Sequence, residues 1–444
     1  MSHIVISGGG PCSLLLTHLL MDNDPTMTIT IYEKAPCPSL ASSNGNDFGF
    51  AIGERHLRVV RMVKGLEERV QSVARTIHSP SGFSLLMVGR QALVSVMLEH
   101  LQSQHGGRVT IVYNATCGTI DFEGRTMDVW VDDHLTNVSY DALVAADGVH
   151  SSVRSQLAQR GDISAEKYLS ATSWKAFRLP PQPDLPDADA LKRIRSDGVT
   201  GFVIPRHPKG YSIILKWTSS HLSPWGCSTA TELHARLMAA VPGLTVFDVA
   251  ESEHLLQARA GRETYVKVDR YHHGRVALIG DAAHGMYPFL GQGLAAGLDG
   301  AARLAHSLME HGSDIETAFE TYSAQHVPEA QAIAELNLID HLFDYRVTQL
   351  LLMPILFLVF LPTLFRKLNV VQGPLVPFTQ LHRDNWLLLW VARHLWRWQR
   401  QEAPSRWVEQ PKQSEPAVEL SSQLRRASSM DVGVLRGPLR LAVL

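Results

Sequence analysis

The pattern of hydrophobic residues changes twice along the chain, and these two changes divide the chain into regions. Over residues 3–35 a short apolar run, a glycine-rich turn, an apolar stretch and a second apolar run follow one another. This order predicts a strand, a helix and a second strand, the start of a parallel sheet. Residues 90–105 carry apolar side chains at helical spacing, and the runs 109–113, 126–131 and 141–146 are strand-like.

Between residues 165 and 270 the pattern changes to short alternating runs separated by proline-rich turns, for example at 201–204 and 212–217. Such runs predict an antiparallel sheet. The first pattern returns at 275–310. We therefore expect an α/β fold: a Rossmann-like parallel sheet domain, assembled from non-contiguous segments, with an inserted antiparallel β-sheet domain and C-terminal hydrophobic helices.

The C-terminal part suggests contact with a membrane. Residues 347–365 carry no charge and are about long enough to span a hydrocarbon core, although two prolines interrupt them. Residues 386–398 mix tryptophans with arginines, which is typical of a helix at a membrane interface. The sequence predicts an intracellular, membrane-associated protein that spans or lies on the membrane through 347–400. The alternative is a buried helical cap over the second lobe.

Composition narrows the class of protein. The 444 residues are 45% hydrophobic and 19% charged, which excludes a wholly disordered chain and allows a large core. The formal net charge of −2 gives the protein no overall positive potential that would attract nucleic acid. No nucleic-acid partner is therefore expected. The four cysteines are far apart and form no CxxC pair, so neither a disulfide framework nor a metal site is expected.

A glycine-rich segment at 8–13 follows the first strand and precedes a helix, the context that a dinucleotide fingerprint requires. Gly8 permits the tight turn, and Gly10 lets the backbone approach a pyrophosphate. Ser13 stands where the pattern has its third glycine. Glu33, about twenty residues on, is placed to accept hydrogen bonds from a ribose diol. The alternative is a tight turn beside a solvated acid.

A second segment, 280–293, follows a strand-like run and opens a helix of small residues. It has the form of an anion-binding turn at a helix N-terminus, where free N–H groups and the helix dipole favour negative charge. His284, close to Asp281, is interpreted as a structural residue and not as a base. No Ser-His-Asp or metal constellation accompanies these segments.

With Arg90 and the Asp147-Gly148 turn, these motifs resemble the single-component FAD-dependent aromatic hydroxylases over about residues 3–310. The resemblance implies FAD and NADPH as cofactors. It implies catalytic positions at Pro288, beside the reactive flavin carbon, and at Gly291. The implied cofactor-binding residues are Gly8, Gly10, Ser13, Glu33, Arg90, Asp147, Gly148, Asp281, Gly291, Gln292, Gly293 and Leu294.

Within that family the pattern is most similar to the kynurenine 3-monooxygenases, through residues 75–82, 288–293 and 327–346. That similarity implies four substrate-binding residues: Arg75, Phe83, His341 and Asp344. In those enzymes the arginine that matches Arg75 pairs with the substrate carboxylate, so the same role is expected here. An asparagine and a glutamate of those enzymes are replaced here by His341 and Asp344, and Ala295 replaces the asparagine after the glycine–glutamine–glycine run.

The implied activity is insertion of one oxygen atom from O2 into an aromatic or apolar small molecule through a flavin C4a-hydroperoxide. The protein would position the substrate and exclude water, since the cofactor performs the oxygen chemistry. Two alternatives remain open: a lipid or terpenoid epoxidase on the same scaffold, and a membrane-associated flavoprotein without hydroxylase activity, suggested by Ser13 and Ala295. A halogenase is disfavoured because 288–293 has the hydroxylase form.

The expected division of the chain follows from these assignments. The FAD-binding domain comprises 1–165 and 271–335, and the substrate domain comprises 166–270. A helical, membrane-associated segment covers 336–402, and a disordered tail covers 403–444.

Overall fold

The computed structural model describes residues 3–37, 49–78, 84–182, 185, 192–206, 210–218, 220–339, 375–402 and 406–408. Contacts within the chain divide it into one compact unit, 1–409, and a second, 410–444. The second unit lies outside the described residues, as does most of the expected tail.

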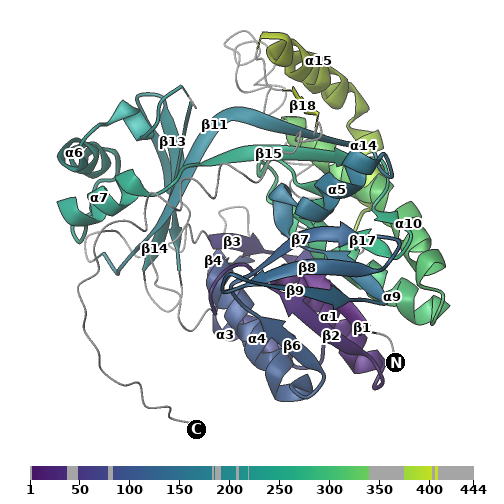
Figure 1. The fold of residues 1–444 in the computed structure, drawn as a ribbon. Helices are drawn as coiled ribbons and strands as arrows, with labels where there is room; N and C mark the ends of the chain where they lie inside the picture. Colours follow the sequence, from purple (N-terminus) through teal and green to yellow (C-terminus); the bar gives the residue numbers. More distant parts are fainter. Residues whose placement is uncertain are drawn as a thin grey trace, which may run out of the picture. The chain divides into compact units, whose positions relative to one another are not determined.

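A six-stranded sheet with the order β16-β17-β10-β1-β2-β6 organises the first part of the chain (Figure 1). Neighbouring strands pair in parallel, except that β16 pairs with β17 in the antiparallel direction. The strands are β1 (His3–Ser7), β2 (Thr28–Tyr32), β6 (Val109–Val112), β10 (Ala142–Ala145), β16 (His272–His273) and β17 (Val276–Leu278). Since β1 lies between β2 and β10, the strand order reverses beside β1, which is where open α/β sheets bind ligands.

Helices pack against this sheet and against one another. The long ones are α1 (Pro11–Asn23), α4 (Arg90–His105), α9 (Gly293–His311) and α10 (Ile315–Leu336). The shorter ones are α2 (Glu54–Val60), α3 (Leu66–Ser72), α5 (Ser152–Arg160) and α8 (Asp281–His284). Gly297 allows α9 to approach α1 closely, because a Cβ there would lie 2.6 Å from the Cys12 sulfur.

Two small antiparallel sheets flank the parallel one. The first has the order β3-β5-β4 and the second β7-β8-β9. Their strands are β3 (Gly49–Ile52), β4 (Arg75–His78), β5 (Ser84–Gly89), β7 (Ala115–Asp121), β8 (Thr126–Val131) and β9 (His134–Ser139). Ile120 of β7 and Met127 and Val129 of β8 belong to the main hydrophobic core, so the second sheet packs onto the parallel-sheet layer.

The region from 165 to 268 forms a separate antiparallel sheet with the order β12-β13-β14-β11-β15. Its strands are β11 (Ala165–Leu179), β12 (Lys192–Ser196), β13 (Val199–Pro205), β14 (Tyr211–Thr218) and β15 (Gly261–Val268). Helices α6 (Ala230–Ala240) and α7 (Val249–Gln257) share a core with it, as Figure 1 shows beside β13 and β14. The predicted fold class, a parallel sheet with an inserted antiparallel sheet and C-terminal helices, is confirmed.

The prediction of a membrane-associated chain is wrong for the part of the chain that the structure describes. No helix there combines the length and the apolar character needed to cross a membrane. The uncharged run at 347–365 lies outside the described residues. Helices α14 (Phe378–Asp384) and α15 (Trp386–Glu402) are present, and α15 buries Leu389, Ala392 and Trp396 in a core that it shares with α10. This packing agrees with the alternative interpretation of a helical cap.

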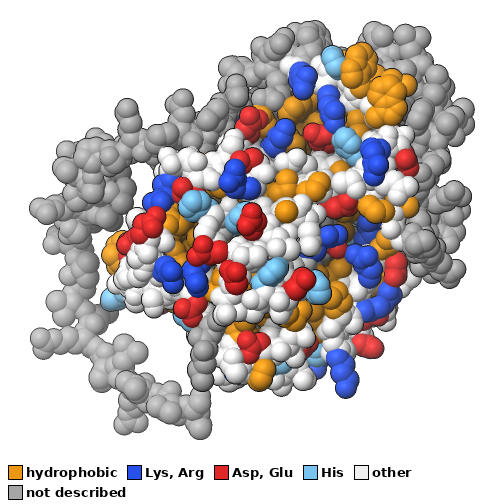
Figure 2. All heavy atoms as spheres, turned by 90° about the vertical axis from the view of Figure 1, so that its right-hand side faces the viewer, with side chains coloured by type: hydrophobic (Ala, Val, Ile, Leu, Met, Phe, Trp, Pro, Cys, Tyr) orange, Lys and Arg blue, Asp and Glu red, His pale blue; other side chains and the backbone are white. Residues whose placement is uncertain are grey.

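The other face of α15 exposes both polar and apolar side chains. Trp386, Leu387 and Trp390 are exposed, and hydrophobic side chains gather at the top of the face shown in Figure 2. Acidic and basic side chains are interspersed over the rest of that face. Beyond α15, strand β18 (Arg406–Val408) pairs with β11, so ordered backbone extends into the region expected to be a tail from 403.

Candidate functional site

The residues expected to bind the cofactor follow the ends of parallel strands, at one edge of the sheet. Ser7 is in register with Tyr32 on one side and with Ala145 on the other, and Ala145 is in register with Leu278. These are the last residues of β1, β2, β10 and β17. The segments that follow these strands contain Gly8, Glu33, Asp147 and Gly280. They therefore lie close to one another, at the carboxyl edge where such sheets bind ligands.

The turn after β1 is held by its two neighbours. Gly8 has a φ of +102°, and a Cβ there would lie 2.5 Å from the Ala146 carbonyl oxygen, so no other residue fits. The Gly9 N–H donates to Glu33 Oε2 at 2.6 Å, and the Ala35 N–H donates to Oε1 at 2.8 Å. Each carboxylate oxygen of Glu33 keeps a lone pair for a further donor, such as a ribose hydroxyl.

Gly10 is the N-cap of α1, and no side chain caps this helix. A Cβ at Gly10 would meet nothing within 4 Å, so the backbone here borders open space. Ser13 is fully buried and donates its hydroxyl to the Gly10 carbonyl oxygen at 2.7 Å. The serine that replaces the third glycine thus fits within the turn, and the helix N-terminus stays accessible to an anion.

The turn after β10 is tied to the turn after β17 by a buried arginine. Arg154 is 0% exposed, and its guanidinium donates to the Ala282 carbonyl at 2.9 Å and to the Val149 carbonyl at 3.0 Å. In the same turn, Asp147 Oδ2 accepts from the Ser152 N–H at 2.8 Å. Asp147 Oδ1 is buried without a hydrogen-bond partner among the described residues, and burial raises the pKa of this carboxyl.

Asp281 begins α8 and carries a carboxyl whose pKa the protein shifts. Its side chain is exposed to solvent, yet burial by the surrounding protein raises the pKa of the carboxyl, while Arg90 and then Arg154 lower it. Burial, with a contribution from Asp281, raises the pKa of Cys12 to about 12, so the thiol stays protonated and inert.

The loop before α9 presents backbone to the same region. Pro288 and Gly291 are exposed, Gly291 has a φ of +65°, and a Cβ on Gly291 would meet nothing within 4 Å. Gln292 is the N-cap of α9 but does not cap it with its side chain, and its buried Oε1 has no partner in the described part of the chain. The N–H groups of the first turn, from Gly293 and Leu294 onward, are consequently available to a ligand.

Asn337 anchors this loop, and the sequence interpretation missed it. The residue is 0% exposed, and its Oδ1 accepts from the Leu290 N–H at 2.8 Å. Its Nδ2 donates to the Ile333 carbonyl at 2.8 Å and lies 3.4 Å from the Met286 sulfur. Asparagine just after a helix is so common at helix ends that nothing in the sequence distinguished this one.

His284 packs inside the protein. It is buried, and burial lowers its pKa to about 4, which keeps the ring neutral. Its Nε2 lies 3.3 Å from Nε2 of His326, on α10. This packing agrees with the structural role expected for it.

Of the four expected substrate residues, the structure describes only Arg75. It is half-buried on β4, in register with Met87 of β5. Ile77 and Met87 of this small sheet form a hydrophobic cluster with Ile204 of β13, so β4 lies against the inserted sheet. Phe83, His341 and Asp344 lie outside the described residues.

These residues fit a bound dinucleotide. Two buried acceptors, on Asp147 and Gln292, lack partners among the described residues, as polar atoms do where a ligand normally satisfies them. A Cβ at Gly10, Gly148 or Gly291 would meet nothing within 4 Å, so the glycine backbone is open where a ligand must come close.

Comparisons with known proteins identify relatives of this chain. A family model described as an FAD binding domain matches residues 47–337. The kynurenine 3-monooxygenase of Stenotrophomonas maltophilia is 28% identical over 366 residues, which cover 76% of this chain and 78% of that protein. The kynurenine 3-monooxygenase of Phaeosphaeria nodorum is 28% identical over 302 residues, covering 64% of this chain and 60% of that protein.

Solved structures share the fold. The tetrameric form of 2-methyl-3-hydroxypyridine-5-carboxylic acid oxygenase matches with a TM-score of 0.63 at 20% identity, covering 76% of this chain and 90% of that one. PqsL of Pseudomonas aeruginosa, in complex with 2-aminobenzoylacetate, matches with a TM-score of 0.55 at 20% identity, covering 76% of this chain and 94% of that one.

Proposed function

The chain belongs to the FAD binding domain family, and we propose that it is an NADPH- and FAD-dependent monooxygenase that inserts one oxygen atom of O2 into an aromatic or otherwise apolar small molecule. At the level of the family, the expected FAD-dependent hydroxylase is confirmed. The observation that carries the proposal is the convergence of four motif segments at one edge of the parallel sheet. Two buried acceptors there lack a partner among the described residues, and the glycine backbone is open.

We assign the cofactor site residue by residue. Glu33 would accept hydrogen bonds from the ribose of FAD, and the N-terminus of α1 at Gly10 would face the diphosphate. Arg90 would neutralise phosphate charge, while Asp281, at the start of α8, would accept hydrogen bonds from the cofactor. The other proposed cofactor contacts are Gly8, Ser13, Asp147, Gly148, Gly291, Gln292, Gly293 and Leu294. The FAD-binding part then comprises 1–165 and 271–335, and the substrate part 166–270.

Bound FAD would supply the redox chemistry, taking a hydride from NADPH and activating O2 so that one oxygen atom reaches the substrate and the other leaves as water. The protein's part is electrostatic and positional. The N-terminus of α9 provides a partial positive charge where negative charge develops on reduction. Pro288 and Gly291, exposed on the loop, would border the reacting atoms. Asn337 holds that loop in place.

The surroundings of the Asp147 turn suit a nicotinamide dinucleotide as the reductant, since its diphosphate is anionic. Lys167 Nζ lies 2.8 Å from His150 Nδ1, on the exposed side of this turn. Burial lowers the pKa of His150, and the positive charges of Lys167, Lys34, Arg154 and Arg259 lower it further. A cluster of cations here suits a phosphate-bearing dinucleotide.

Substitution of Arg75 tests the substrate side of the proposal. Arg75→Ala is expected to raise KM for a carboxylated substrate about 10- to 100-fold, since a charge-assisted hydrogen bond contributes about 1.5–3 kcal/mol. The visible spectrum of bound flavin should be unchanged. Steady-state NADPH oxidation gives KM, and Arg69→Ala, an exposed arginine on α3, serves as the control. An unchanged KM would remove Arg75 from the substrate site.

Asn337→Ala tests the anchoring of the loop. The variant should lose about tenfold or more in kcat, because a small misplacement of reacting groups is costly, while FAD affinity stays within about threefold. Asn385→Ala is a matched control, since Asn385 makes the same bond to the carbonyl four residues back, at 2.7 Å from Leu381. Equal kcat values for the two variants would show that the loop does not depend on Asn337.

A product screen tests the reaction itself. The chain is incubated with NADPH, FAD, isotopically labelled O2 and a panel of aromatic acids and lipids, and products are analysed by mass spectrometry. We expect one labelled oxygen atom in an aromatic product. NADPH consumption that yields only hydrogen peroxide with every compound would oppose monooxygenation, and a labelled lipid epoxide would favour the epoxidase.

A further inference from the structure

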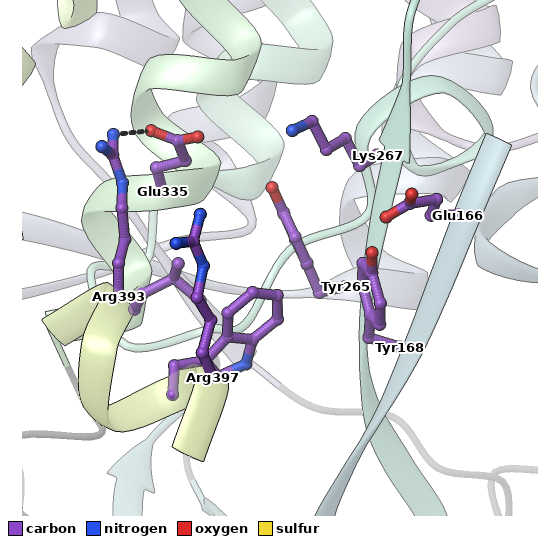
Figure 3. Close-up of a pocket in the computed structure, with 9 residues that line it drawn as sticks. Glu166, Tyr168, Tyr265, Lys267, Glu335, Arg393 and Arg397 are labelled. Carbon is purple, nitrogen blue, oxygen red and sulfur yellow. Dashed lines mark hydrogen bonds and ion pairs between the residues drawn. The ribbon is translucent and has the colours of Figure 1, made fainter. Parts of the chain in front are cut away.

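A cavity lies between β11 and β15 on one side and α10 and α15 on the other, and none of the residues that line it is one of the proposed flavin-binding residues (Figure 3). Its volume is about 230 Å³. Pockets for drug-sized ligands measure about 300–1,000 Å³, so this one has room for a single-ring molecule.

Three aromatic rings form one wall of the cavity. Tyr168 and Tyr265 are stacked across the two strands with ring centroids 5.7 Å apart. The Trp396 ring meets both edge-on, at 5.3 Å and 5.8 Å. These rings come from three separate elements and present a rigid surface against which a flat ring can pack.

Polar groups converge on the same space. Figure 3 shows the Lys267 ammonium, the Arg397 guanidinium and the Tyr265 hydroxyl pointing into the cavity. Within the described residues, Lys267 and Arg397 form no ion pair, and the Tyr265 hydroxyl has no hydrogen-bond partner. Tyr265 is only 3% exposed, and burial raises its pKa, so the hydroxyl remains a donor. A hydroxyl that lines a cavity and has no partner among the described residues is available to donate to a ligand.

The charges that line the cavity favour an anion. Glu335 is already engaged, because it pairs with Arg393 and its Oε2 lies 2.7 Å from His382 Nε2. Glu166 is the other acid of the lining. The three cations Lys267, Arg393 and Arg397 exceed the two carboxylates by one positive charge, which matches a ligand with one negative charge.

We propose that this cavity binds a small aromatic monocarboxylate at a site separate from the flavin. The carboxylate would meet Lys267 and Arg397, the ring would pack against Tyr168 and Trp396, and a hydroxyl substituent would bond to Tyr265. The Tyr265 ring lies 6.0 Å from that of Tyr287, the residue before Pro288. A ligand in this cavity therefore contacts Tyr265, whose ring lies near Tyr287, at the start of the loop assigned to the flavin.

Calorimetric titration of the full chain with salicylate, at saturating FAD, tests the site. Lys267→Met and Arg397→Met should each weaken binding about tenfold or more, as expected for a charge-assisted contact. Both side chains are exposed, so folding should be unaffected. Arg270→Met, which removes an exposed cation outside the cavity, should bind as the native chain does.

Two further measurements separate this site from others. Tyr265→Phe should weaken salicylate but leave benzoate affinity unchanged, because only salicylate carries the hydroxyl group. Arg75→Ala should retain salicylate binding. Unchanged affinity in both Lys267→Met and Arg397→Met would overturn the proposal, as would loss of binding in Arg75→Ala alone. Neither outcome depends on turnover, so failure here is distinguishable from failure of the proposed monooxygenase activity.

Discussion

Gly10→Val is expected to lower the affinity for FAD at least about 100-fold while the fold stays intact. A Cβ at Gly10 meets nothing within 4 Å, and the backbone has an ordinary extended conformation with a φ of −81°. The substitution should therefore cost no more than about 1 kcal/mol of folding free energy, as an N-cap change does. A branched side chain would instead occupy the space through which the diphosphate approaches the helix N-terminus, and a 100-fold loss corresponds to about 2.8 kcal/mol.

Flavin fluorescence titration and thermal unfolding measure the two effects separately. Gly107→Val is the matched control, because Gly107 also faces open space but lies between α4 and β6, at the opposite end of the strands. The control should bind FAD as the native chain does. If Gly10→Val binds FAD with native affinity, the diphosphate does not lie at α1.

Arg154→Met is expected to reduce both stability and FAD binding. The guanidinium is fully buried, so its loss leaves the Ala282 and Val149 carbonyls without their donors, at a cost of about 3 kcal/mol or more. It also frees the Asp147 turn from α8, and these are two of the four segments that converge on the proposed site. Arg154→Lys should recover little, because one ammonium cannot reproduce the fork that reaches both carbonyls.

Urea unfolding and flavin titration test this prediction together. Arg108→Met is a matched control: Arg108 likewise donates to two carbonyls, those of Asp24 at 2.8 Å and Met21 at 2.9 Å, but it precedes β6. The control should lose some stability and keep its FAD affinity. Native affinity in a folded Arg154→Met chain would show that the two turns do not depend on this arginine.

The parts of the site that lie close together in sequence were predictable. A strand, a glycine turn and a helix at the N-terminus follow from local hydrophobic spacing, and the glycines at 8–13 and 291–293 follow from backbone demands that only glycine meets. The parallel sheet also followed, since alternating strands and helices restrict the topology strongly.

The long-range contacts were not predictable. Asn337 bonds to Leu290, which is 47 residues earlier in the chain, and Arg154 bonds to Ala282, which is 128 residues later. A polar residue carries no sign of its distant partner until the fold brings the two together. The aromatic cavity combines residues from β11, β15 and α15 for the same reason.

The membrane prediction failed because composition does not say what covers an apolar face. The mixture of tryptophan and arginine at 386–398 suits a lipid interface, but it also suits a helix that buries one side against protein. In the structure Leu389, Ala392 and Trp396 are buried, and Arg393 pairs with Glu335 of α10.

Titration of the purified chain with FAD tests the proposed site most directly. We predict saturable binding of one FAD per chain, with the visible absorption of bound oxidised flavin, and bleaching of that absorption when NADPH is added without oxygen. A folded chain that binds no FAD at saturating concentration would contradict the proposal.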